Sequence, residues 1–226
     1  MVAGRREDPV WLRPEQAPTG RPGELSRAQI TAAAVAVADA DGLDAVTMRR
    51  VAAALGTGAA SLYRYVLSRE DVLDLMTDAV AAGYELQPPT ADWRRDLLDV
   101  ARQQRALLRR HPWLAQLTLV RPALGPHGMD LLEHVVSCLA PVPASGSAKL
   151  EAFAVLTALV AAHVQNEVAL PAAERRKQLV SFAHAVAAGR HPHLAALAAQ
   201  AAPGAADPES AFDDLVLRVL GGLLGA

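Results

Sequence analysis

Apolar residues recur at spacings of three and four along most of the chain, as they do on one face of an α-helix. Ser26 is placed to cap the first such segment, which we expect to end at Asp41-Gly42, because glycine readily adopts the left-handed conformation beyond a helix end. A short helix is expected to follow Thr47, another to span 59–65, and Ser68 is placed to cap a fourth helix.

Proline and glycine divide the rest of the chain into further predicted helices. These cover residues 92–110, 113–120, 126–139, 147–170, 172–188 and 208–224. Residues 195–206 are alanine-rich and fit a loop as well as a helix. No segment has the alternation of a convincing strand, so the pattern predicts an all-α fold.

Composition supports helices and excludes several classes of protein. Of the 226 residues, 52% are hydrophobic and only 4% aromatic, which favours packed helices over sheets. The net charge of −2 excludes a globally basic nucleic-acid coat protein. Cys138 is the single cysteine, so an intrachain disulfide is impossible. The sequence shows no secretory signal, and its longest near-apolar run, 152–164, is too short to span a bilayer, so we expect a cytoplasmic protein.

Charge along the chain is far less even than the total implies. Residues 45–69 contain four arginines and no acid, while acidic residues flank the segment on both sides. A helix, a glycine turn at Gly56 and a second helix with arginine, serine and tyrosines is the pattern of a helix-turn-helix. Such a second helix can enter the major groove of DNA. The alternative is a solvated basic loop beside a core helix.

The residues of this segment also carry a family resemblance. The stretch from Ser26 to Met76 resembles the DNA-binding domain of TetR-type transcriptional regulators. The matching motifs are Thr47-Met48-Arg49-Arg50-Val51-Ala52, Leu55-Gly56, Ser61-Leu62-Tyr63-Arg64-Tyr65 and Ser68-Arg69-Glu70-Asp71-Val72-Leu73. The resemblance implies an all-helical homodimer that binds a palindromic operator and releases it when a small molecule enters the C-terminal domain.

The resemblance also implies which residues contact DNA. They are Thr47, Arg49, Ser61, Tyr63, Arg64, Tyr65 and Arg69. Tyr63 would hold a phosphate, and Arg64 is the best candidate for reading guanine. Tyr65 fits equally well as a residue packed beneath the first helix.

Three domains follow from this assignment: a disordered tail over 1–25, a helix-turn-helix domain over 26–72, and a ligand-binding and dimerisation domain over 73–226. The four arginines of the tail are matched by four acids, which favours disorder without DNA contact over an arm in the minor groove.

The C-terminal half predicts a dimer and a pocket. The run 152–164 is apolar on all faces and therefore needs cover on both sides. We expect a homodimer through the helices at 147–170 and 208–224. Side chains with polar or polarisable groups that lie on apolar helices are candidates for an effector site. They are His111, Trp113, Met129, His163, Asn166 and Glu167.

The C-terminal half also loosely resembles the regulatory domain of the tetracycline repressor, with one departure. If Arg121-Pro122 anchors the comparison, Leu117 occupies the position of the histidine that binds the metal in that group. We therefore expect no metal and no cofactor, and an uncharged or weakly polar hydrophobic effector.

An enzyme is not expected, because the chain lacks a phosphate-binding glycine loop, a GxSxG motif and an HExxH motif. The sequence favours a ligand-responsive repressor. The alternative is a helical small-molecule-binding or adaptor protein whose helix-turn-helix does not bind DNA.

Overall fold

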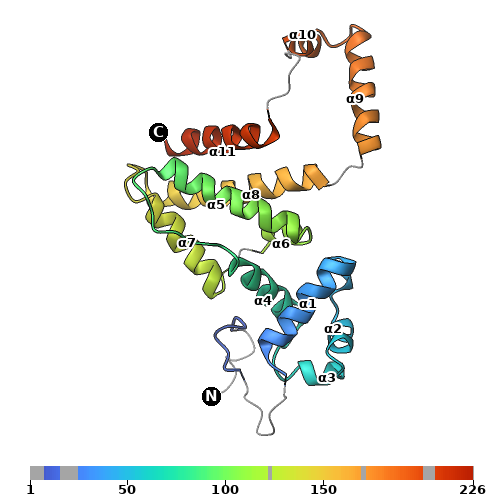
Figure 1. Cartoon of the computed structure of the whole chain (residues 1–226), viewed down its shortest axis with the longest axis vertical. Helices are drawn as coiled ribbons and strands as arrows, with labels where there is room; N and C mark the ends of the chain where they lie inside the picture. The colour runs from blue at the N-terminus through green and yellow to red at the C-terminus, as the bar shows by residue number, and fades with distance from the viewer. Residues whose placement is uncertain (1–7, 16–24, 122–123, 169–171, 201–206, 226) are drawn as a thin grey trace.

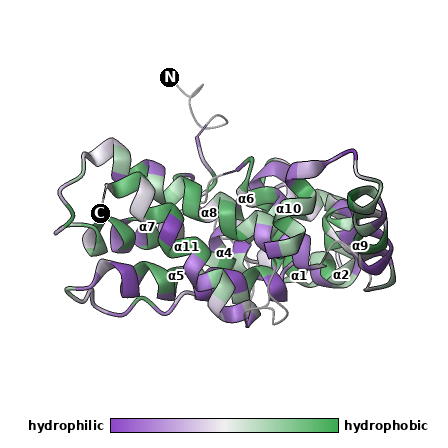
Figure 2. Cartoon of the chain, turned by 90° about the horizontal axis from the view of Figure 1, so that it is seen from above, coloured by the Kyte–Doolittle hydropathy of each residue, from purple (hydrophilic) through white to green (hydrophobic). Residues whose placement is uncertain are grey.

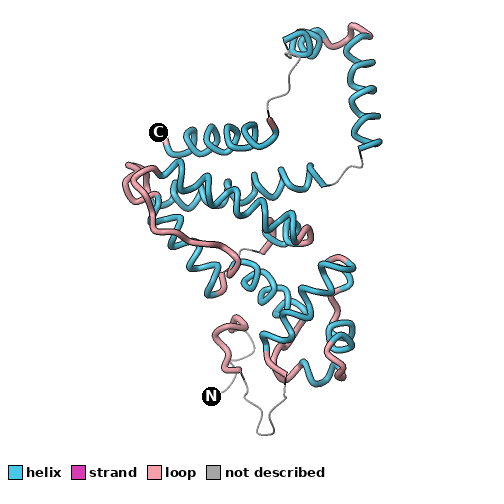
Figure 3. Tube along the Cα trace, in the orientation of Figure 1, coloured by secondary structure: helices cyan, strands magenta, loops and turns pink. Residues whose placement is uncertain are grey.

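The computed structural model describes residues 8–15, 25–121, 124–168, 172–200 and 207–225. Within these ranges the chain is helical and contains no strand, which confirms the all-α prediction (Figure 3). The N-terminal helices are α1 (Arg27–Asp41), the 3-10 turn η2 (Leu43–Ala45), α2 (Met48–Ala54), α3 (Ala59–Leu62) and α4 (Arg69–Ala81). The others are α5 (Trp93–Arg110), α6 (Leu114–Thr118), α7 (Pro126–Cys138), α8 (Gly146–Val168), α9 (Ala172–Ala187), α10 (Pro192–Gln200) and α11 (Pro208–Leu224).

Side-chain caps set the starts of three N-terminal helices, as the sequence predicted. The hydroxyls of Ser26, Thr47 and Ser68 accept hydrogen bonds from backbone N–H groups three residues later. Each hydroxyl satisfies a donor that the helix itself leaves without a partner. Helices α1, α2 and α4 therefore begin where the sequence places them.

Helices α1 to α4 form a compact module at one end of the molecule (Figure 1). Helix α1 packs against α2 and α4, and α2 packs against α3. Ile30, Leu62 and Met76 are completely buried in this module. The short helix α3 is thus held from behind by apolar contacts, while its other face remains open.

Helices α5, α7, α8 and α11 build the second part of the molecule, with α6 at its junction with the first (Figure 1). Helix α8 contacts α5, α6, α7 and α11. It carries many hydrophobic residues (Figure 2). By length and composition alone the stretch 146–167 could cross a membrane: an 18-residue window in it has a mean hydropathy of 1.4, and 28% of that window is buried within the chain. Some apolar side chains of α8, such as Val155, are exposed.

One segment differs from the sequence prediction, and one that the sequence left open is partly resolved as a helix. Residues 8–15, predicted as part of a disordered tail, pack against the protein: Val10 is fully buried and Arg13 is 9% exposed. The remaining tail residues, 1–7 and 16–24, lie outside the described part of the chain. In the ambiguous alanine-rich segment, α10 is helical as far as Gln200, and 201–206 also lie outside the described residues.

A buried carboxylate joins the two parts. Asp78 of α4 is 8% exposed, and its Oδ1 accepts a hydrogen bond of 3.0 Å from the backbone N–H of Gly128 in the first turn of α7. Its Oδ2 lies 2.9 Å from Nδ1 of His127. An acidic group is favoured at a helix N-terminus, where backbone N–H groups lack partners. Asp78 therefore caps α7 from a helix 50 residues away in the sequence.

The close fit at this cap predicts the effect of replacing Gly125, which precedes α7. A Cβ atom at Gly125 would lie 2.3 Å from Oδ1 and 2.8 Å from Cβ of Asp78. Because Asp78 Cβ is close to the backbone of α4, the helices would have to separate. We expect Gly125→Ala to destabilise the protein by about 1–3 kcal/mol in denaturant unfolding.

Gly146→Ala is the matched control, because a Cβ atom there meets nothing within 4 Å. Equal stability of the two variants would show that the cap does not constrain this junction.

Candidate DNA-binding and effector sites

The basic segment at 45–69 divides into two paired and two unpaired arginines. Arg50 donates to Asp41 at 2.7 Å, and Arg69 donates to the carbonyls of Val46 and Leu43 at 2.6 and 3.0 Å. Within the described chain, Arg49 and Arg64 form neither an ion pair nor a side-chain hydrogen bond, and both are exposed. Two guanidinium groups on this surface are therefore free for an external anion.

Helix α3, which we call the recognition helix, and the turn after it present hydroxyls close in sequence to Arg64. Tyr63 is 49% exposed, and Ser61 is partly exposed on α3. Thr47 is exposed at the start of α2, where its hydroxyl already caps the helix. Hydroxyls and unpaired arginines on one face are the groups that proteins use to hold phosphates and to read base edges.

Two predicted DNA contacts are used by the fold itself. Tyr65 is only 6% exposed and belongs to the hydrophobic core, as the packing alternative proposed, so its assignment to DNA is corrected. The guanidinium of Arg69 ties the start of α4 to the loop before α2. Arginine has five donors in a rigid fork, which suits it to hold two carbonyls at once.

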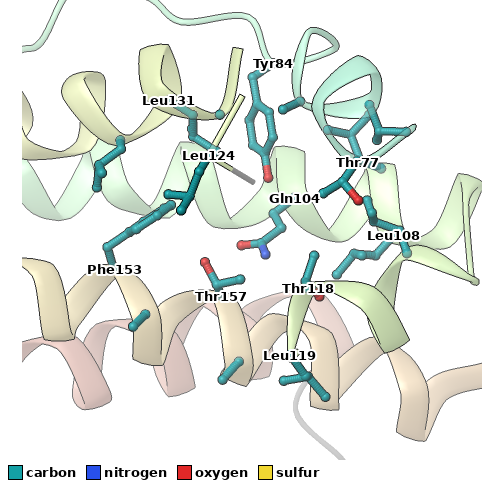
Figure 4. Close-up of a pocket in the computed structure, with 18 of the residues that line it drawn as sticks. Thr77, Tyr84, Gln104, Leu108, Thr118, Leu119, Leu124, Leu131, Phe153 and Thr157 are labelled. Atoms are coloured by element: carbon teal, nitrogen blue, oxygen red, sulfur yellow. The ribbon is translucent and has the colours of Figure 1, made fainter. Parts of the chain in front are cut away.

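A cavity of about 410 Å³ lies between α4, α5, α6, α7 and α8. Leucines from α5, α6 and α7, together with Phe153 of α8, form much of its wall (Figure 4). Among the described residues that line it there is no Asp, Glu, Lys, Arg or His. Its size falls within the range of small-molecule sites, and its lining suits an uncharged, largely apolar ligand.

A few polar groups point into this cavity. Gln104 is 5% exposed, and its amide faces the space between Tyr84 and Thr157 (Figure 4). Burial raises the pKa of Tyr84, so its hydroxyl stays protonated and can donate. Thr77 also lines the cavity, but its hydroxyl donates to the carbonyl of Leu73 at 2.9 Å. In the described chain the Gln104 amide and the Tyr84 hydroxyl have no hydrogen-bond partner, so they can orient a ligand.

None of the six residues predicted to bind the effector lines this cavity. Asn166 is exposed on α8, and Met129 is 47% exposed on α7. The predicted set therefore does not form one pocket. The four remaining residues fall into two polar clusters.

His163 and Glu167 belong to an ion cluster that joins α5, α8 and α11. Arg105, with a side chain 3% exposed, contacts Glu167 at 2.5 Å and Glu209 at 2.6 Å. Arg109 contacts the same Glu167 at 3.0 Å, and His163 Nε2 lies 3.0 Å from it. Although burial acts to raise the pKa of Glu167, hydrogen bonds from Arg105 and Arg109 lower it to about 2. These ion pairs join the three helices through side chains of the chain itself.

His111 and Trp113 instead link the two parts of the molecule. The indole Nε1 of Trp113 donates to Asp39 Oδ1 at 2.6 Å, and His111 Nδ1 lies 2.7 Å from the same oxygen. Asp39 belongs to α1. This contact therefore joins the module of α1 to α4, which we call the DNA-binding module, to the start of α6. His111 and Trp113, predicted to bind the effector, therefore form a contact between the two parts of the molecule.

Sequence reasoning missed Gln104, Tyr84 and Arg105. Gln104 and Arg105 lie on α5 between Ala101 and Leu108, both of which are fully buried. Their place within that apolar spacing was a usable signal of burial. No comparable signal marked Tyr84, because it follows the end of α4 in a segment without periodicity.

Helix α4 takes part in both sites. Thr77, Val80 and Ala81 line the cavity, while Val72, Leu73 and Met76 are buried near the DNA-binding module. Asp78, between these sets, caps α7. The helix that follows the recognition helix therefore also forms part of the cavity wall.

Comparison with known proteins agrees with this arrangement. The chain matches the family described as "Bacterial regulatory proteins, tetR family" over residues 30–76, and "Tetracyclin repressor-like, C-terminal domain" over residues 87–224. It is 37% identical over 200 residues to the HTH-type transcriptional repressor DrrR1 of Streptomyces coeruleorubidus, covering 83% of this chain and 74% of that protein.

Solved structures show the same fold. Apo ActR from Streptomyces coelicolor superposes with a TM-score of 0.78 at 28% identity, covering 91% of this chain and 97% of that one. The complex of ActR with actinorhodin gives a TM-score of 0.74 at 28% identity, covering 90% and 97%. The match to the C-terminal family spans more than half of the residues, and a second match covers the helix-turn-helix. This chain belongs to the TetR family of bacterial regulatory proteins.

Proposed function

We propose that this protein is a cytoplasmic repressor that binds a palindromic operator as a homodimer and releases it when an uncharged, largely apolar small molecule fills the cavity. The observation that carries this proposal is the double role of α4, which lines the cavity and directly follows the recognition helix. The similar protein DrrR1 is named a transcriptional repressor, which favours repression over activation.

DNA binding is assigned to Arg49, Arg64 and Tyr63, with Thr47 and Ser61 beside them. The two arginines are unpaired within the described chain, and the Tyr63 side chain is half exposed. The adaptor alternative assigns no partner to this surface, whereas phosphates and base edges are partners for its exposed arginines and hydroxyls. We therefore favour DNA as the partner of this surface.

The effector is assigned to the cavity beside Gln104 and Tyr84. The apolar wall favours a hydrophobic molecule, and the two polar groups favour one with both a hydrogen-bond acceptor and a donor. ActR has been solved with actinorhodin and with (S)-DNPA. Actinorhodin is therefore a reasonable first probe of the cavity.

The dimer is assigned to α8 and α11, which pack side by side. On these helices Val155 and Leu223 are 37% and 39% exposed. A second copy would cover this apolar surface, which is otherwise open to water. A two-fold axis through these helices would also present two recognition helices to two half-sites.

Release follows from the spacing of these half-sites. Recognition helices that read half-sites one turn apart need a separation of about 34–36 Å. A ligand between α4 and α7 would push on α4 and on the Asp78 cap. A shift of α4 would change the separation and lose the contacts to one half-site.

The DNA assignment predicts different effects on operator affinity for variants of Arg64 and Arg50. On DNA from the region upstream of its own gene, Arg64→Ala should weaken binding by about 1–3 kcal/mol per half-site. The slope of log K against log salt should change little, because loss of a phosphate contact rather than a base contact would lower it by about 2 per dimer. Fluorescence anisotropy at several salt concentrations measures both quantities.

Arg50→Ala is the matched control, because Arg50 is already paired with Asp41. It should change the affinity little. Equal losses of operator affinity for both variants would mean that only the total charge of the protein matters. Unchanged affinity of Arg64→Ala would show that Arg64 does not contact DNA. Failure of the wild-type protein to bind at low salt would favour the adaptor alternative.

The effector assignment predicts that a bulky side chain in the cavity mimics the ligand. Thr157→Trp would fill part of the space between α4, α5 and α8. We expect its operator affinity to fall by about tenfold, within the usual range of allosteric coupling. Actinorhodin, which should quench the intrinsic fluorescence of the wild-type protein, should bind the variant more weakly.

Ala106→Trp adds the same side chain on an exposed position of α5 outside the cavity. This control should bind the operator as the wild type does. Unchanged operator affinity of a folded, dimeric Thr157→Trp variant would contradict the coupling.

A further inference from the structure

Residues 8–15, which we call the N-terminal clamp, are packed on the DNA-binding module. The segment turns on itself through a hydrogen bond of 3.0 Å from Leu12 N–H to the Pro9 carbonyl. Val10 is 0% exposed and Trp11 is partly buried against the hydrophobic core. In Figure 1 the clamp (dark blue) lies beside the N-terminal end of α1. A segment with a fully buried valine is part of the fold.

Arg27, the first residue of α1, connects the clamp to the end of the recognition segment. Its backbone N–H donates to Glu15 Oε1 at 2.7 Å, and its Nη1 donates to the Arg13 carbonyl at 2.8 Å. Its Nε donates to the Tyr65 carbonyl at 3.0 Å. One guanidinium therefore holds the clamp and the residues after α3 in a fixed relation.

Arg13 makes a second connection, to the start of α4. Its Nη2 lies 2.5 Å from Asp71 Oδ2, and the two side chains are 9% and 16% exposed. The same carboxylate oxygen accepts a hydrogen bond of 2.6 Å from the backbone N–H of Leu67. Leu67 lies in the corner between α3 and α4. Arg13 thus fixes the orientation of the carboxylate that fixes this corner.

The recognition helix needs such support because it is short. Helix α3 has four residues, too few for its own hydrogen bonds to define its direction. Leu62 and Tyr65 anchor it from behind, and Arg27, which also bonds to the clamp, holds the backbone at its C-terminal side. Tyr63 and Arg64 lie between these anchored positions.

We propose that the N-terminal clamp is a positioning element for the recognition helix, and that Arg13 raises operator affinity through Asp71 without touching DNA. The effect on operator affinity rests on the proposed DNA binding. The effect of the clamp on the order of residues 59–68 does not. Ordering a surface before it binds reduces the conformational freedom that binding must remove.

The first test compares Arg13→Ala with Arg13→Lys on the upstream DNA described above. Arg13→Ala should lower operator affinity about tenfold, and Arg13→Lys, which keeps a cation beside Asp71, should recover part of the loss. The slope of log K against log salt should stay the same, whereas loss of a phosphate contact would lower it by about 2 per dimer. A lowered slope would overturn the proposal in favour of direct contact.

Asp71→Asn separates positioning from simple charge. Removing an acid near DNA should strengthen binding if only the net charge matters. The clamp predicts weaker binding, because the Asp71 contacts to Arg13 and Leu67 are weakened together. Stronger binding of this variant would contradict the proposal. Arg102→Ala, which removes an exposed ion pair with Asp213 far from the module, is the control and should bind as the wild type does.

Hydrogen exchange of the free protein tests the clamp without DNA. Arg13→Ala should speed amide exchange in residues 59–68 and leave α8 unchanged. Unchanged exchange at 59–68 would overturn the clamp even if DNA binding fell. If the wild type binds no DNA while exchange at 59–68 responds as expected, the proposed function fails and the clamp's effect on operator affinity fails with it. Faster exchange throughout the protein would mean general destabilisation, and would also overturn a positioning role.

Discussion

The burial of α4 on two sides is the constraint on which the other features depend. Its first half packs in the core of the DNA-binding module, and its second half lines the cavity. Between them the Asp78 carboxylate is enclosed by the N-terminus of α7, where even the Cβ of an alanine at position 125 would not fit. Packed interfaces tend to shift between discrete arrangements rather than deform gradually. A helix held in this way can transmit a change in the cavity to the DNA-binding surface.

Charge is distributed to suit this arrangement. The net charge of −2 is an average that includes the basic segment 45–69. Two of the four arginines in that segment, Arg50 and Arg69, make contacts within the fold. Arg49 and Arg64 alone remain unpaired among its arginines in the described structure. The cavity, in contrast, has no charged residue among the described residues of its wall. The unpaired arginines of the basic segment are thus exposed at the DNA-binding module, and the cavity wall is largely apolar.

Local signals made much of the fold predictable from the sequence. The caps Ser26, Thr47 and Ser68 act within three residues, and the helical spacing is a property of each segment alone. The helix-turn-helix could be found because its turn and its arginines lie within one short stretch. The locations of the free arginines could not, because pairing depends on where Asp41 and the Val46 carbonyl lie in space.

The effector site was not predictable for the same reason. A polar residue on an apolar helix signals burial, but only the fold shows its partner. Glu167 meets Arg105, 62 residues away, and Trp113 meets Asp39, 74 residues away. The N-terminal segment shows the same limit. Residues 8–15 were predicted to be disordered, yet Val10 and Arg13 are buried, and Arg13 pairs with the distant Asp71.

The separation between the two recognition modules of the dimer tests the central claim most directly. Because Cys138 is the single cysteine and is fully buried, a cysteine introduced at the exposed Ala54 is the accessible site for a spin label. Pulsed electron paramagnetic resonance would compare the label-to-label distance in the otherwise wild-type dimer and in the dimer that also carries Thr157→Trp. Coupling through α4 predicts a shift of the distance distribution of at least about 2 Å. Identical distributions in the two dimers, with the tryptophan shown to occupy the cavity, would contradict the account.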